Sequence, residues 1–271
     1  MKKTFITLLL ITAFSSVNAQ TSLTETEIKQ KCDSILEEGN TLYKYEKAAW
    51  ITSDMAMDKK EIKKDFGGLL IYQRNDSISA IVMAKDGTKC IYEVIFKNSF
   101  NNPCKESLIV RDLTEAEKNL QQIKKKMFKE VVNDEKYQVS CPQGYNINME
   151  LIPYELGYKL YFILGTSQSK LIPFGNDYVF FGDKEGNVTS WRKIHSRLIF
   201  SPTEYEGNKV TGLSHSHLKT EPFISATDIC TFKLYGSLYE LNEFEVLSTG
   251  LRKFFKYKLI QNEIETRDME L

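Results

Sequence analysis

The chain has 271 residues, of which 36 are basic and 36 are acidic, so its formal net charge is zero. A balanced charge provides no long-range attraction to nucleic acid or to an anionic membrane surface, and we expect neither partner. With 42% hydrophobic and 12% aromatic residues, the composition is that of an ordinary globular protein. The length is sufficient for one large or two small domains.

Residues 1–19 have the pattern of a secretory signal peptide. Two lysines at positions 2 and 3 precede an apolar core over 5–14, and Val17-Asn18-Ala19 is a cleavage site of small residues. The apolar core is about ten residues long, whereas a helix that spans a bilayer needs about 20, so no membrane span is expected after signal removal. We therefore expect an exported protein, either periplasmic or secreted.

The five cysteines lie beyond this segment, and an exported protein meets an oxidising compartment. An odd number leaves at least one thiol unpaired. Cys90 and Cys104 are separated by a predicted strand and a polar loop, and they are the pair that we expect first. The five are Cys32, Cys90, Cys104, Cys141 and Cys230.

Residues 20–140 are predicted to form a helix, a β-meander and a second helix. Thr24-Glu25-Thr26-Glu27 is a capping box, and apolar residues follow at helical spacing as far as Gly39, which predicts a helix over about 25–38. The turn sequences Asn75-Asp76 and Asp86-Gly87 divide the apolar residues of 68–96 into strands, which favours an antiparallel meander. A second amphipathic helix is expected over 114–132.

Strand patterns return in residues 141–271. Strands are expected over 158–164, 177–181 and 188–193, the last two joined by a hairpin. A strand over 210–217, a helix over 225–241 and two closing strands complete the region. The predicted fold class is α+β, with an N-terminal helix and antiparallel meander followed by a mixed sheet and one helix.

The strand over 210–217 carries two of the three histidines, His215 and His217. Alternation along a strand places both side chains on one face, where they can bind a divalent cation. Asp228, at the start of the following helix, is a candidate third ligand. Two histidines and one carboxylate leave a tetrahedral position for water, which is the arrangement of hydrolytic zinc sites.

The order His-x-His, seven residues, Ser, two residues, Asp resembles the motif of the JAMM (MPN-plus) metalloproteases, which include deubiquitinating isopeptidases. The resemblance implies that His215, His217 and Asp228 bind zinc and that Ser225 stabilises the tetrahedral intermediate. It also implies a glutamate as general base. The family's Glu-x-x-Gly-x-Leu-x-Gly segment does not occur here, and Glu155 is the nearest substitute. The histidine block also resembles a block in exported bacterial proteins that have no established activity.

A simpler interpretation needs no metal. Ser225 and Asp228 occupy the N-cap and N3 positions of a helix, where a hydroxyl and a carboxylate are favourable. This explains both residues but not the histidine pair. The third histidine, His195, is isolated in the sequence, and we expect it to be a structural or surface residue.

Two functions therefore remain open at this point. The first is an exported, zinc-dependent hydrolase that acts on peptide or cell-wall amides. The alternative is a non-catalytic exported binding or structural protein in which the metal site is vestigial or absent. The sequence does not indicate the oligomeric state.

Overall fold

The computed structural model describes residues 23–97 and 99–270. The predicted signal peptide, residues 1–19, lies outside the described residues. In the described part of the chain the fold is α+β, as predicted, with an N-terminal helix and both antiparallel and mixed sheets. None of the described helices combines the length and the apolar character that a membrane span requires.

The N-terminal region is an antiparallel sheet of order β1-β2-β3-β4 with helices packed around it, so the predicted meander is confirmed. Its first and third helices, α1 and α3, each begin at a capping box, formed by Thr24 and Thr114, respectively. The elements are α1 (Glu25–Met57), α2 (Lys60–Lys64), β1 (Phe66–Arg74), β2 (Ser77–Ala84), β3 (Lys89–Phe96), β4 (Lys105–Asp112) and α3 (Glu115–Asn133).

A second antiparallel sheet, of order β5-β6-β8-β9, follows a short 3₁₀ helix, η1 (Glu135–Tyr137). The predicted hairpin is confirmed, because β8 and β9 pair through the turn that contains residues 184–187. Two separate two-stranded antiparallel sheets, β7 with β10 and β11 with β12, lie in the same part of the chain. The strands are β5 (Asn146–Tyr154), β6 (Gly157–Gly165), β7 (Leu171–Gly175), β8 (Tyr178–Gly182), β9 (Val188–Lys193), β10 (Leu198–Pro202), β11 (Glu204–Tyr205) and β12 (Asn208–Lys209).

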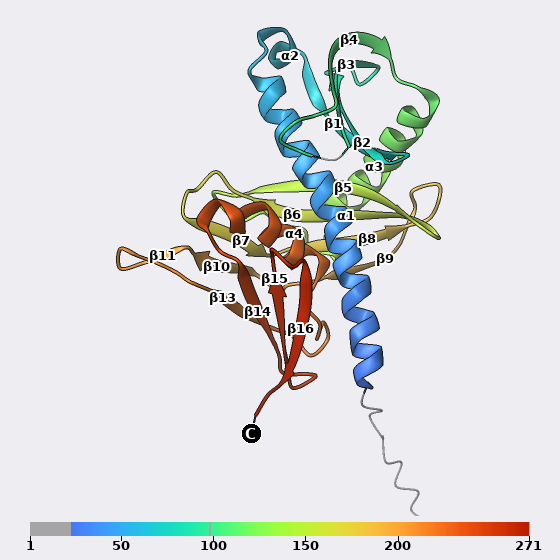
Figure 1. Cartoon of the computed structure of the whole chain (residues 1–271). Helices are drawn as coiled ribbons and strands as arrows, with labels where there is room; N and C mark the ends of the chain where they lie inside the picture. Colours follow the sequence, from blue (N-terminus) through green and yellow to red (C-terminus); the bar gives the residue numbers. More distant parts are fainter. Residues whose placement is uncertain (1–22, 98, 271) are drawn as a thin grey trace, which may run out of the picture.

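The C-terminal sheet has the order β13-β14-β15-β16. Strands β13 (Leu213–His217) and β14 (Glu243–Ser248) are parallel, and the chain between them contains α4 (Ala226–Tyr235) and the 3₁₀ helix η2 (Gly236–Tyr239). The predicted order of strand, helix and strand around the histidines is therefore confirmed. Strands β15 (Lys253–Lys258) and β16 (Glu263–Asp268) complete the sheet. Figure 1 shows the β5-β6-β8-β9 sheet between the other two four-stranded sheets.

Helix α1 is much longer than the sequence predicts, because it continues through Gly39 to Met57. The prediction that the helix ends near residue 38 is wrong. A Cβ atom at position 39 would lie 2.8 Å from the Cβ of Ile229 in α4, so the glycine allows α1 and α4 to pack closely. Tertiary packing here outweighs the low helix propensity of glycine, which costs about 1 kcal/mol relative to alanine. Figure 1 shows α1 running the length of the molecule.

All five cysteines are free, and the expected pairing of Cys90 with Cys104 is wrong. Cys90 lies near the start of β3, whereas the backbone N–H of Cys104 donates to the carbonyl of Ile95 near the opposite end of that strand. Five residues of strand separate these positions by about 16 Å, and a disulfide requires Cα atoms within about 7 Å. The strand geometry therefore prevents this disulfide.

The main hydrophobic core includes residues from both sides of the predicted boundary at residues 140 and 141. Tyr45 of α1 and Val82 of β2 belong to the same buried cluster as Ile229 of α4 and Phe244 of β14. Because α1 contacts both the N-terminal sheet and α4, it connects the two regions. A side chain near this helix can therefore be buried by residues from either region.

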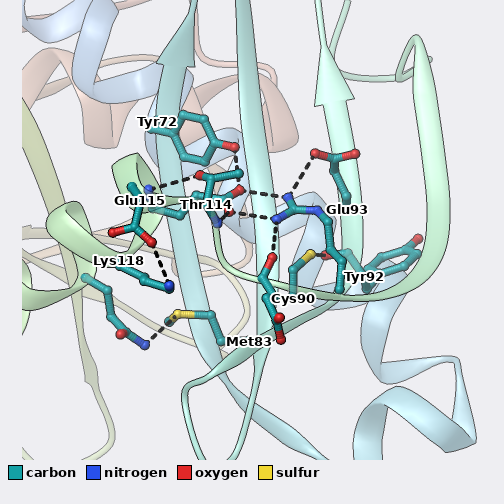
Figure 2. A network of polar contacts seen from close by, with 12 residues as sticks. Tyr72, Met83, Cys90, Tyr92, Glu93, Thr114, Glu115 and Lys118 are labelled. Atoms are coloured by element: carbon teal, nitrogen blue, oxygen red, sulfur yellow. Dashed lines mark hydrogen bonds and ion pairs between the residues drawn. The ribbon is translucent and has the colours of Figure 1, made fainter.

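A buried ion network fixes α3 against the N-terminal sheet, and Figure 2 shows it from close by. The guanidinium of Arg111 on β4 donates two hydrogen bonds of 2.7 Å to the carboxylate of Glu117 on α3. The hydroxyl of Tyr72 on β1 donates to the same carboxylate at 2.8 Å. Burial alone would raise the pKa of Glu117, but the bonds from Arg111, Thr114 and Tyr72 lower it to about 2. The helix is thus anchored through an ionised, fully hydrogen-bonded acid.

We expect the substitution Arg111→Met to lower the free energy of unfolding by about 3 kcal/mol, because it leaves the buried Glu117 carboxylate without its cation. Urea unfolding measures this change. The matched control is Lys118→Met, which removes an exposed ion pair with Glu115 on the same helix. That change is expected to stay below about 0.5 kcal/mol. Equal effects of the two substitutions would contradict an anchoring role for Arg111.

Candidate metal centre

Three separate segments bring four side chains with metal-binding atoms to one point. His215 and His217 extend from the same face of β13, Asp228 lies in the first turn of α4, and His195 follows β9. One ligand atom from each side chain lies within 4.8 Å of the ligand atoms of the other three. The structure therefore joins the two predicted histidines and the predicted aspartate, and it adds the third histidine of the chain.

The separations within this cluster match those of a tetrahedral metal site. The Nε2 atom of His217 lies 2.8 Å from Nε2 of His195 and 3.2 Å from Nε2 of His215. The carboxylate of Asp228 lies 3.4, 3.2 and 3.1 Å from the Nε2 atoms of His195, His215 and His217. Ligands at about 2.0–2.1 Å from a tetrahedral zinc ion are about 3.3 Å from one another. The cluster could thus hold such an ion with little movement.

Two of the histidines are held in the tautomer that a metal ligand needs. The Nδ1 atom of His195 lies 2.7 Å from a carboxylate oxygen of Asp177, and Nδ1 of His217 lies 3.1 Å from the carbonyl oxygen of Glu221. Because both partners are acceptors, each Nδ1 carries the hydrogen and each neutral ring presents a lone pair at Nε2. Two lone pairs that face each other at 2.8 Å repel, so a cation must lie between them: either a proton or a metal ion.

The two oxygens of Asp228 have different partners. The backbone N–H and the hydroxyl of Ser225 donate to Oδ2 at 2.9 and 2.7 Å, which completes the capping box predicted at the start of α4. The other oxygen, Oδ1, is buried and has no hydrogen-bond partner among the described residues. A buried carboxylate oxygen without a donor is costly. The helix cap and a metal site are therefore compatible, since each uses a different oxygen.

Burial and the neighbouring charges shift the pKa values of the residues in this cluster. Burial lowers the pKa of His195, but the carboxylates of Asp177 and Asp228 outweigh it and raise this pKa to about 9. Burial lowers the pKa of His215. Burial would raise the pKa of Asp228, whereas the three neighbouring histidines bring it well below its usual value. Without a metal ion, the site thus retains an ionised carboxylate and a proton on His195.

Two of the residues singled out in the sequence lie elsewhere or are otherwise engaged. Glu155 lies in the exposed turn between β5 and β6 and does not belong to the four-residue cluster. Ser225 lies beside the site, but its hydroxyl is engaged with Asp228 and lies 2.9 Å from the hydroxyl of Thr227. The hydroxyl of Thr227 also donates to Asp177, the partner of His195. The start of α4 thus fixes both a ligand and the residue that orients another.

His195 was expected to be an isolated structural or surface residue, but it lies just after the second strand of the predicted hairpin. Strands β8 and β9 pair Tyr178 with Lys193, so one further step along the ladder brings Asp177 beside residues 194 and 195. The backbone N–H of Ile194 donates to the carbonyl of Asp177, and the N–H of His195 donates to its carboxylate. The predicted hairpin of residues 177–181 and 188–193 was the sequence signal that pointed toward this contact, but the hairpin register, which shifts between Phe181 and Gly182, cannot be read from it.

The metal cluster borders a cleft of about 650 Å³, whose lining includes His195 and His215. Phe200 and Leu218 also line it, and they are 70% and 50% exposed, respectively. His217 and Asp228, in contrast, are buried. One side of the cluster is therefore reached from a cleft with partly apolar walls, and the other side is closed by the protein.

Comparison with protein-family models, with curated proteins and with solved structures gave no match.

Proposed function

We propose that this chain is an exported zinc-binding protein in which His195, His215, His217 and Asp228 hold one ion. The proposal rests on one observation: the Nε2 atoms of His195 and His217 face each other at 2.8 Å, beside the buried Oδ1 of Asp228, which has no hydrogen-bond partner among the described residues. Imidazole and carboxylate ligands at tetrahedral separations favour zinc among the divalent ions, and a carboxylate that orients a histidine ligand is typical of zinc sites. Residues 1–19 support export.

The primary role proposed for the ion is structural. Four protein ligands fill a tetrahedral site, whereas catalytic zinc sites have three protein ligands and an open position. The ligands come from the segment after β9, from β13 and from α4, so one ion would connect three segments that are far apart in the sequence. This corresponds to the alternative that the sequence left open, a binding or structural protein without catalysis, but with the metal retained.

Elemental mass spectrometry of the purified protein after zinc incubation and desalting tests this proposal. We expect about one zinc ion per chain in the unmodified protein and a loss of most of it in His217→Ala and Asp228→Asn. Glu155→Ala is the control, because this residue lies in an exposed turn and should leave the zinc content unchanged. A protein without zinc after incubation, or two ligand variants with a full complement of zinc, would contradict the proposal.

A second candidate function is metal-dependent hydrolysis of peptide or cell-wall amides, and the cleft beside His195 and His215 favours it. The ion would supply a Lewis acid there. The resemblance to the JAMM motif also supports this candidate, with His215, His217 and Asp228 as ligands. His195 would then need to leave its position among the ligands to make room for substrate or water.

Hydrolysis of a broad peptide library and of peptidoglycan fragments by the zinc-loaded protein tests this second function. Activity that is lost in His217→Ala and kept in Glu155→Ala would support the hydrolytic function. It would also mean that a residue other than Glu155 acts as the general base. Zinc-loaded protein that cleaves none of these substrates would leave the structural role as the proposed function.

A further inference from the structure

A separate cavity of about 720 Å³ lies where α1, α3 and β1 meet β5. Its volume is within the range of small-molecule pockets, which is about 300–1,000 Å³. Its walls come from both sides of the boundary predicted near residue 140, and ligand pockets occur preferentially at such junctions. Its lining includes none of the four residues of the metal cluster.

Two buried glutamates line this cavity, Glu46 from α1 and Glu150 from β5, each only 3% exposed. The side-chain amide of Asn148 donates to Oε2 of Glu46 at 3.0 Å. The remaining oxygen, Oε1 of Glu46, and Oε2 of Glu150 are buried and have no hydrogen-bond partner among the described residues. An unpaired buried acceptor costs about 1–3 kcal/mol and is uncommon in folded proteins. Each glutamate therefore has one oxygen that no described residue serves as donor.

The surroundings do not neutralise this pair. Burial, together with the charge of Glu150, raises the pKa of Glu46 to about 8, and burial raises the pKa of Glu150 to about 7. Lys124 and Lys125 of α3 also line the cavity, and Lys124 favours the ionised acids, but neither lysine donates to an unpartnered oxygen. Near neutral pH the pair therefore retains a proton, and a cation bound in the cavity would take the place of that proton.

The rest of the lining is mainly apolar and aromatic. Trp50 and Tyr235 lie with their ring centroids 5.6 Å apart, and Phe128 and Leu69 complete the apolar wall. Aromatic rings pack against apolar groups and attract organic cations. A hard divalent ion, in contrast, needs six or more oxygen ligands around one point. Asp54, the third carboxylate of the lining, does not join Glu46 and Glu150 in a group that could hold a metal ion among the described residues.

We propose that this cavity binds a small organic amine, whose ammonium group lies between Glu46 and Glu150 and whose apolar body packs against Trp50, Phe128 and Tyr235. An ammonium group donates three hydrogen bonds, enough for one to each glutamate. The charge of the ligand compensates the two buried acids, and its body fills the aromatic part of the cavity. This site is independent of the proposed zinc site, because the two share no residue.

Isothermal titration calorimetry with tryptamine, tryptophol and indoleacetate tests the proposal, because these probes share an indole ring and differ in the charge of the side chain. We expect tryptamine to bind at least about tenfold more tightly than tryptophol, and indoleacetate to bind most weakly, since a buried charge pair discriminates strongly by sign. Equal binding of the amine and the alcohol, or no binding of tryptamine, would overturn the proposal.

The substitutions Glu46→Gln and Glu150→Gln keep the shape of each side chain and remove its charge. We expect each to reduce tryptamine affinity at least about tenfold while tryptophol binding, which reports an intact cavity, stays unchanged. Glu155→Gln is the matched control, because Glu155 is exposed in the turn after β5 and does not line the cavity, and we expect it to retain the preference for the amine. A preference for tryptamine that survives both glutamine substitutions would overturn the proposal. If neither variant folds, the comparison of the three probes in the unmodified protein decides alone.

Discussion

Removal of zinc with a chelator is expected to lower the melting temperature by about 8–16 °C. A ligand present at about 1,000 times its dissociation constant stabilises the folded state by about 4 kcal/mol. For a chain of this size, 1 kcal/mol corresponds to about 2–4 °C. The loss should be large because the ion would connect three segments that are far apart in the sequence, and its removal breaks that connection. Differential scanning calorimetry, with and without chelator, measures it.

Ligand variants separate this effect from other actions of the chelator. His217→Ala is expected to melt at or below the temperature of the chelated protein and to show no rise when zinc is added. Glu155→Ala should respond to zinc as the unmodified protein does, since it lies in an exposed turn. A melting temperature that neither chelator nor zinc changes would mean that no ion contributes to the stability of this fold.

Zinc affinity is expected to rise about tenfold for each pH unit, or about 100-fold in total, between pH 7 and pH 9. Without metal, burial lowers the pKa of His195, but the stronger influence of Asp177 and Asp228 raises it to about 9. Below that pH a zinc ion must displace the proton on His195 before this histidine can bind the metal. The dependence should therefore level off above about pH 9. Competition against a chromophoric chelator at a series of pH values measures the affinity.

The raised pKa of His195 also predicts that the metal-free protein loses stability as the pH rises, over the same interval in which zinc affinity increases. A histidine whose pKa is higher in the folded state than its unfolded value of about 6.5 stabilises the fold fully below that pH. This contribution is lost as the pH rises from about 6.5 through about 9. The metal-free protein should therefore become less stable over this interval, while the zinc-bound protein should not.

Asp177→Asn is the informative variant for both pH series, because Asp177 holds Nδ1 of His195 at 2.7 Å and contributes to its raised pKa. We expect the pH dependence to move to lower pH and the affinity above pH 9 to fall about 10–100-fold, as for other residues that orient a metal ligand. An affinity that is constant from pH 7 to pH 9 in the unmodified protein would exclude His195 as a protonated ligand.

The local features of the site were predictable because they depend on neighbours in sequence. Alternation along a strand placed His215 and His217 on one face, and the capping pattern placed Ser225 and Asp228 at the start of α4. Each of these geometries is set by backbone periodicity and by hydrogen bonds within a few residues. The expected order of strand, helix and strand followed from the same local patterns.

The sequence alone thus determined an α+β chain with a β-meander, helices capped at Thr24 and Ser225, and a histidine pair beside an aspartate. Only the tertiary structure extended α1 through Gly39, added His195 as a fourth side chain of the cluster, and brought Glu46 and Glu150 into one cavity. Each of these depends on packing between segments that are distant in the chain. Local propensity and spacing carry no information about such contacts, because a residue's distant neighbours are fixed only when the core forms.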